Sequence, residues 1–214
     1  MKLLSVGLAR AMWFLDTNEL NPGGKDLFQH LLPSLLDEYK FRTYPKPSDD
    51  LSQGMKFLNG QFVKEDGTVL IVNATIFSDG IAADSYSSTG DSEDFLQMAL
   101  GDFPDLGFAY EPGMVTRRAY VSQVTVRCGG HLRALNPRLA EFSNRVSSAV
   151  GGTPFDLAAI ELWPDQTQVF KPVNFSFQRK VGDPPSGDRY WSQAALATDR
   201  HLELLEDLEA ILSE

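Results

Sequence analysis

Four polar side chains on one predicted β-hairpin are the best placed in this sequence to do chemistry. They are Asn73, Thr75, Asp84 and Tyr86. Asp79 and Gly80 predict a tight turn, because Asp-Gly tolerates the positive φ angles of two-residue hairpin loops. Such a turn sets Thr75 opposite Asp84 and Asn73 opposite Tyr86, and the two-residue period of a strand puts all four on one face. Asp84 could then serve as a general base and Tyr86 as an acid or orienting donor.

The same face has a second interpretation, as the solvated side of a sheet that buries only its other side. The register decides between the two, since a slip of one residue moves Asp84 to the opposite face. A buried Asp84 with a raised pKa would favour a small-molecule enzyme with this face in a pocket. An exposed Asp84 on a flat face would argue against it.

The sequence lacks the usual motifs for catalysis and metal binding. The chain has no Walker A loop, no G-x-G-x-x-G opening a helix, no G-x-S-x-G and no H-E-x-x-H. Its three histidines are far apart in sequence, so a zinc site built from His and Cys is not expected. Cys128 and His131 could form a nucleophile pair, or be a buried thiol beside a surface histidine. No metal and no cofactor is expected.

The predicted hairpin belongs to an antiparallel meander with turns at 59–60, 66–67 and 79–80. The expected strands cover residues 55–58, 61–64, 68–77 and 81–87. In the third strand, the side chains expected to form the apolar face are Leu70, Val72, Ala74 and Ile76. The other face is mixed but begins with Val69 and Ile71, so the strand is apolar on both sides at its start and is expected to lie in the middle of a sheet.

Strands and helices are also expected on both sides of the meander. Strands are expected within residues 3–15, 106–110, 116–128, 155–163 and 173–180. Helices are expected at 26–40 with a break at Pro33, at 92–100, at 137–150 and from Thr198 onward. Arg179, Arg189, Tyr190 and Trp191 either hold a long loop or anchor an interface. Together these elements predict a single α+β domain over residues 1–214, with an antiparallel meander sheet and about four flanking helices.

Composition limits the kinds of partner. The formal charge is −10 and hydrophobic residues make up 43% of the 214, so the chain can bury a core, and its surface repels nucleic acid and anionic membranes while attracting basic proteins. A lone cysteine excludes an internal disulfide and favours a reducing compartment. The N-terminal apolar stretch is interrupted by Arg10 and is interpreted as a strand rather than a signal peptide. A cytoplasmic location is expected.

These features favour a non-catalytic interaction protein that binds a basic partner. The residues expected to bind it are exposed acids and an aromatic near the meander: Asp79, Asp84, Tyr86, Asp91, Glu93 and Asp94. The alternative is the enzyme that uses Asp84 and Tyr86. A third possibility, a structural subunit, requires an uncovered apolar stripe on the last helix, and that stripe is expected to pack on the sheet.

Three segments in the first half of the chain carry a resemblance to a known family. They are RAMWFLD, DLFQHLLPSLLDEYKF and FSDGIAADSYSSTGDSED. Their layout resembles that of small acidic bacterial immunity proteins, which neutralise a cognate toxin, often a nuclease, by masking its active site. The resemblance implies a cytoplasmic inhibitor that works without a cofactor.

Overall fold

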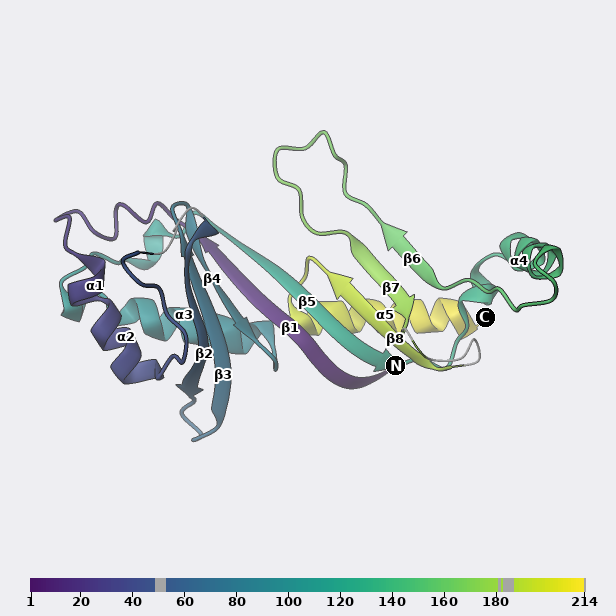
Figure 1. Cartoon of the computed structure of the whole chain (residues 1–214), viewed down its shortest axis with the longest axis horizontal. Helices are drawn as coiled ribbons and strands as arrows, with labels where there is room; N and C mark the ends of the chain where they lie inside the picture. The colour runs from purple at the N-terminus through teal and green to yellow at the C-terminus, as the bar shows by residue number, and fades with distance from the viewer. Residues whose placement is uncertain (49–52, 181, 183–186, 214) are drawn as a thin grey trace. The chain divides into compact units, whose positions relative to one another are not determined.

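The computed structural model describes residues 1–48, 53–180, 182 and 187–213. Within them, eight strands form one antiparallel sheet in the order β2-β3-β4-β1-β5-β8-β7-β6 (Figure 1). The strands are β1 (Lys2–Phe14), β2 (Met55–Val63), β3 (Val69–Phe77), β4 (Gly80–Ser85), β5 (Arg117–Arg127), β6 (Ala159–Leu162), β7 (Phe175–Arg179) and β8 (Arg189–Ala194). The α-helices are α1 (Leu27–His30), α2 (Leu32–Tyr39), α3 (Thr89–Gly101), α4 (Pro137–Ala149) and α5 (Thr198–Ser213). The predicted α+β class is confirmed.

The chain divides into two compact units, each described by itself below. The central unit is Leu8–Val121, and the terminal unit combines Met1–Gly7 with Ser122–Glu214. Strands β1 and β5 each contribute residues to both units. The expectation of one domain over residues 1–214 stays a prediction, because a shared sheet does not by itself make two units unfold together.

The central unit buries one face of its strands under α2 and α3 (Figure 1). The β3 side chains that reach this core are those of the predicted apolar face: Leu70, Val72, Ala74 and Ile76. From the helices, the rings of Tyr39 and Phe95 meet edge-on with their centroids 5.0 Å apart. Phe62 of β2 approaches Phe95 in the same way at 5.8 Å. Because aromatic pairs of this geometry add to area burial, they fix α2 and α3 on the sheet.

Two of the predicted turns have different outcomes. The turn at Gly67 is confirmed, since Lys64 and Thr68 close the β2–β3 hairpin and Gly67 has a φ of +82°. The turn at Asn59 is wrong, because β2 runs through it with a β-bulge between Phe57 and Gly60. Asn59 has a φ of +55°, and its backbone N–H donates to the side-chain oxygen of Asn73 at 2.8 Å. Asn-Gly therefore supplies the positive φ of a bulge instead of a hairpin turn.

The β3–β4 hairpin is present with a shifted register. Its two-residue turn is Ser78 and Asp79, so Phe77 pairs with Gly80 and Asn73 with Asp84. The predicted pairing was displaced by two residues and is corrected here. Because side chains alternate with period two, a shift of two residues keeps Asn73 and Asp84 on one face.

Other predicted boundaries of the central unit need smaller corrections. The break at Pro33 is confirmed, since α1 and α2 are separate helices and Pro33 lies in the first turn of α2. Helix α3 begins at Thr89, three residues earlier than expected, with Ser88 as its N-cap. The strand expected at 106–110 is wrong, because a 3₁₀ turn covers Pro104–Leu106 and Gly107 follows it in the left-handed region.

The terminal unit contains a strand that the sequence did not predict. Tyr190 and Trp191 lie in β8, where Tyr190 pairs with Arg179 of β7 and Trp191 with Gln178. Whether they also hold the neighbouring loop stays a prediction, because residues 181 and 183–186 lie outside the described part of the chain. The Tyr190 ring stacks on Phe177 with the centroids 4.5 Å apart. The predicted strands β5 and β7 are confirmed within two residues at each end, whereas β6 is shorter than expected.

Helix α5 packs on these strands through part of its apolar stripe. Leu205 and Leu212 are buried in the core of the terminal unit, while Leu204 and Ile211 are exposed. Helix α4 begins as predicted, with the Asn136 side chain accepting hydrogen bonds at its first turn. Its Phe142 is 62% exposed, so α4 contributes little apolar burial to the terminal unit.

Candidate functional site

Asp84 lies on β4 between Asn73 of β3 and Arg10 of β1. The Arg10 guanidinium donates to both of its carboxylate oxygens, from Nε at 2.6 Å and from Nη2 at 2.8 Å. This hydrogen bonding to Asp84 raises the pKa of Arg10. The Asp84 side chain is 17% exposed, so the expectation of a freely exposed acid is corrected. A bidentate pair of this kind positions both side chains strongly.

This geometry does not favour Asp84 as a general base. A base must accept a proton through an oxygen that reaches the substrate, and both Asp84 oxygens already accept from Arg10. Asn73 is engaged with the bulge at Asn59. Tyr86 follows the end of β4 and is 56% exposed. Catalysis by Asp84 and Tyr86 stays a prediction without support from these contacts.

Asp91 is a structural acid at the start of α3. It accepts from Lys64 Nζ at 2.6 Å and from the Ser88 hydroxyl at 2.9 Å, while its own N–H donates to Ser88 Oγ. Burial alone would raise the pKa of Asp91, but the hydrogen bonds from Lys64, Ser87 and Ser88 outweigh it and lower the pKa. With 9% exposure, Asp91 is not the exposed acid that was expected.

The next two acids of α3 differ from each other. Glu93 accepts from the Tyr120 hydroxyl at 2.8 Å and from Arg118 at 3.3 Å, so it has partners inside the central unit. Burial, and then the Glu93 hydrogen bond, raise the pKa of Tyr120. Asp94 is exposed. Asp79 is also exposed, in the β3–β4 turn.

Asp94 belongs to an acidic groove between the β2–β3 turn and α3. The groove has a volume of about 790 Å³ and its carboxylates are Glu65, Asp66, Asp94 and Asp102. The exposed Met98 adds apolar surface. Lys64 also lines it, but its ammonium is paired with Asp91. A groove with four carboxylates and one internally paired cation favours a basic ligand.

Only Asp94 of the groove acids was among the predicted residues. Glu65 and Asp66 lie in the hairpin turn, about 30 positions before Asp94, and Asp102 follows the end of α3. Asp66 accepts from the backbone N–H of Thr68, which lowers the pKa of its carboxyl and keeps it ionised. The sequence signal was a turn and a helix that are both acidic, but their contact required the packing of the hairpin against α3.

The remaining candidates for chemistry lie in the terminal unit. The Cys128 thiol is buried and burial raises its pKa, whereas His131 is exposed. A catalytic thiol needs the opposite shift. His201 is fully buried between two serines, and burial lowers its pKa to about 4.

Within residues 1–48, 53–180, 182 and 187–213, no group of three or more His, Cys, Asp or Glu side chains is arranged to hold a metal ion. None of the helices in these ranges is both long and apolar enough to cross a bilayer.

Neither protein-family models nor curated proteins provide a relative of this chain. No protein-family model matches the chain, and no curated protein is significantly similar to it.

Proposed function

We propose that this chain is a non-catalytic binding protein that captures a basic segment of another protein in its acidic groove. The observation that carries the proposal is the gathering of Glu65, Asp66, Asp94 and Asp102 around one groove. Lys and Arg side chains would present their charged heads to these carboxylates. Their aliphatic stems would lie on the exposed Met98, as long basic side chains do on apolar surface.

The distribution of charge supports the same conclusion. The central unit has nine Lys and Arg against seventeen Asp and Glu, a net charge of −8 out of the −10 of the whole chain. The field of such a surface steers a basic partner toward it and raises the association rate, most strongly at low ionic strength. Binding to the groove is therefore expected to weaken as salt is added.

The biological role we propose is that of an immunity-type inhibitor in the cytoplasm, acting on a basic toxin such as a nuclease without a cofactor. A nuclease must present positive charge to its nucleic acid substrate. An acidic groove would compete for that surface by imitating the charge of the substrate. The support for this role is the charge of the groove together with the resemblance in layout described above.

The test compares three forms of the full chain in pull-downs from the source cells at 50 mM and 500 mM salt. They are the wild type, a groove variant (Glu65→Gln, Asp94→Asn, Asp102→Asn) and a control variant (Glu19→Gln, Asp37→Asn, Asp105→Asn). The control changes the net charge equally at exposed acids outside the groove. The affinity of the purified partner is then measured by calorimetry against each form.

An exposed charge pair contributes about twofold to fivefold to an affinity. The groove variant should therefore bind the partner about tenfold or more weakly, and the control within about threefold of the wild type. Binding that is equally tight at both salt concentrations would reject the electrostatic account. If the groove variant and the control variant lost affinity for the partner equally, the partner would be binding outside the groove.

A further inference from the structure

A cleft of about 240 Å³ lies in the central unit where α2 and α3 both end. Its described lining residues are Ser34, Leu35, Asp37, Glu38 and Tyr39 of α2, Ala99 of α3, and Asp102 and Leu106 of the segment that follows α3. Asp102 also lines the acidic groove, so the cleft adjoins the groove at the end of α3. The C-terminal end of a helix carries partial negative charge, which favours a cation at this place.

The Tyr39 hydroxyl is a buried polar group without a partner. Tyr39 is 3% exposed, and its hydroxyl oxygen makes no hydrogen bond within the described residues. Its ring packs edge-on against Phe95 with the centroids 5.0 Å apart, so the core holds the ring in place. A buried hydroxyl that lacks a hydrogen bond destabilises the folded protein, and few such groups occur in native structures.

Two observations place this hydroxyl at the cleft. Tyr39 is itself a lining residue. Burial raises the pKa of Tyr39, and the negative charges of Asp102 and Glu38 raise it further. These two carboxylates belong to different walls of the cleft, Glu38 to α2 and Asp102 to the segment after α3. The hydroxyl is therefore within electrostatic reach of both walls.

The carboxylates of the cleft differ in whether they are paired. Asp37 is paired with Lys40, which is not a lining residue, and the Asp37 side chain is 93% exposed. Glu38 and Asp102 are exposed, and neither has an ion-pair partner in the part of the chain that the structure describes. The described lining residues include no lysine or arginine. The charges of Glu38 and Asp102 are therefore available to a cationic ligand.

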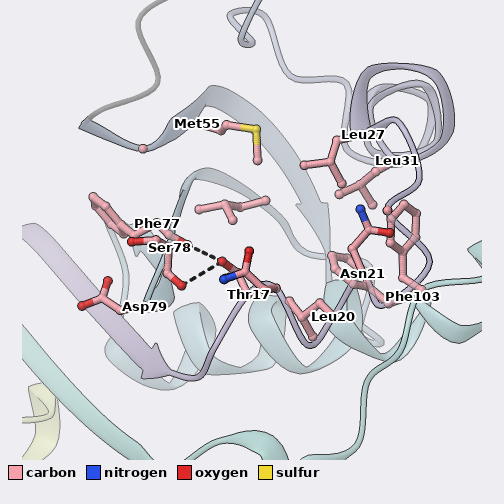
Figure 2. Close-up of a pocket in the computed structure, with 15 residues that line it drawn as sticks. Thr17, Leu20, Asn21, Leu27, Leu31, Met55, Phe77, Ser78, Asp79 and Phe103 are labelled. Atoms are coloured by element: carbon pink, nitrogen blue, oxygen red, sulfur yellow. Dashed lines mark hydrogen bonds between the residues drawn. The ribbon is translucent and has the colours of Figure 1, made fainter.

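The larger cavity of the central unit, about 780 Å³ in volume, differs in this respect (Figure 2). Its Thr17 hydroxyl lies 3.0 and 2.9 Å from two carbonyl oxygens of the β3–β4 hairpin, and its Asn21 amide is bonded to the backbone of Lys25. The Asp79 carboxylate is turned away from Leu27 in Figure 2. These polar groups hold the loops together, so they do not converge on a ligand as those of the cleft do.

An arginine side chain matches the cleft better than a lysine does. A guanidinium presents five N–H donors in one plane, so it can serve a phenol oxygen and two carboxylates at once. An ammonium is a compact and strongly hydrated charge, and it loses more on entering a site with a buried hydroxyl. The partly buried Leu106 leaves apolar surface for the aliphatic stem.

We propose that this cleft binds the guanidinium group of an arginine side chain, which anchors the basic partner beside the acidic groove. The guanidinium lies between Glu38 and Asp102 and donates a hydrogen bond to the Tyr39 oxygen. The proposal rests on the proposed function, because it names the side chain of the partner that enters the cleft. It adds Glu38 and Tyr39 to the binding surface.

The test measures a guanidinium probe directly, without the partner. Nα-acetylarginine methylamide is titrated into the full ¹⁵N-labelled chain at 50 mM salt, in parallel with the corresponding lysine and citrulline amides. Citrulline has nearly the shape of arginine without its charge. The arginine probe should saturate at millimolar concentration, with the amide shifts centred on Tyr39 and Asp102. The citrulline probe should bind about fivefold or more weakly, because it forms neither ion pair, and the lysine probe should lie between them.

Tyr39→Phe separates a role in binding from a role in folding, because it removes only the hydroxyl. That hydroxyl has no partner in the free protein, so the variant should unfold at the same temperature as the wild type or at a higher one. Its affinity for the arginine probe should fall about threefold or more, since a hydrogen bond to a charged group is lost. A structural hydroxyl would give the opposite result, a lower unfolding temperature and an unchanged affinity.

Three charge variants locate the site. Glu38→Gln and Asp102→Asn should each weaken binding of the arginine probe about twofold to fivefold. Asp94→Asn removes the same charge from the groove but not from the cleft, and it should leave the affinity nearly unchanged. All three positions are exposed, so the substitutions leave the core as it is.

The proposal is overturned if the arginine probe does not bind saturably, if the citrulline or the lysine probe binds as tightly, or if Tyr39→Phe leaves the affinity unchanged. Its failure is distinguishable from failure of the proposed function. If the probe does not bind while the wild type still retains a salt-sensitive partner, the arginine anchor alone is wrong. If the probe binds as expected and no partner is retained, the proposed function is wrong and the cleft remains a guanidinium site.

Discussion

His201 makes the stability of this protein depend on pH above the range where carboxylates titrate. The imidazole is fully buried, with Nδ1 at 2.6 Å from Ser122 Oγ and Nε2 at 2.9 Å from Ser192 Oγ. The Ser192 hydroxyl donates its one proton to the carbonyl of Ser176. Nε2 must therefore carry a proton and donate to Ser192, while Nδ1 accepts from Ser122. The network is complete for a neutral imidazole, and a second proton on Nδ1 would take away the acceptor that the Ser122 hydroxyl uses.

The size of the effect follows from the two pKa values. Burial lowers the pKa of His201 from 6.5 to about 4. Below pH 6.5 the unfolded chain binds a proton that the folded protein does not bind until about pH 4, so stability falls as the pH falls through this window. Between pH 7.5 and pH 5.0 the free energy of unfolding should decrease by about 2 kcal/mol from this residue. That is a substantial part of the 5–15 kcal/mol typical of folded domains.

The assay is urea unfolding at pH 7.5 and 5.0 for the wild type, for His201→Gln and for His131→Gln. His131 is exposed, so its variant removes a histidine without removing the buried one. The wild type and His131→Gln should both lose about 2 kcal/mol more on acidification than His201→Gln does. Equal losses in all three proteins would refute the reasoning. If His201→Gln does not fold, a ¹⁵N titration of the wild type decides directly, since His201 should remain the neutral Nε2–H tautomer at pH 5.

Two further predictions concern the central unit. Gly60→Ala should lower stability by about 2 kcal/mol in thermal unfolding, because an added Cβ would lie 2.4 Å from the Phe41 ring in a buried site; a change under 0.5 kcal/mol would contradict this packing. Asp84→Asn should lower stability by about 1 kcal/mol, because Arg10 keeps its charge and loses a charge-assisted partner. Adding Arg10→Met to Asp84→Asn should cause little further loss in a double-mutant cycle, and additive losses would show that the pair is not coupled.

The turn residues predicted the class of the fold correctly, but they predicted the pairing register of the strands less well. The turn at Gly67 was predicted correctly because its hairpin depends only on local residues. Asn59 carries the same positive-φ signal, yet it lies in a bulge that the Asn73 side chain stabilises from the neighbouring strand. Since that contact joins residues 14 positions apart, the dipeptide alone could not distinguish a bulge from a turn.

Strand β8 was missed because its buried residues do not look apolar. Tyr190, Ser192 and Ala194 are its buried positions and alternate regularly. Ser192 is inside because it hydrogen-bonds His201 of α5. Ser192 occupies an inward position of the strand because of its bond to a histidine far away in the sequence, and serine is not hydrophobic. The alternation of buried and exposed residues therefore does not appear as an alternation of apolar and polar residues in this segment.

The sequence also could not show which acids are available to bind a ligand. The sequence displays every carboxylate but not the cation that pairs with it, and the partners of Asp84, Asp91 and Glu93 lie 74, 27 and 25 to 27 positions away. Once these three acids have partners inside the protein, their charge is no longer available to a ligand. Glu65, Asp66, Asp94 and Asp102 are exposed acids that gather at one groove. On an acidic protein, the acids that are paired internally must therefore be set aside before a binding surface is identified, and doing so moves the candidate site from the β3–β4 face to this groove.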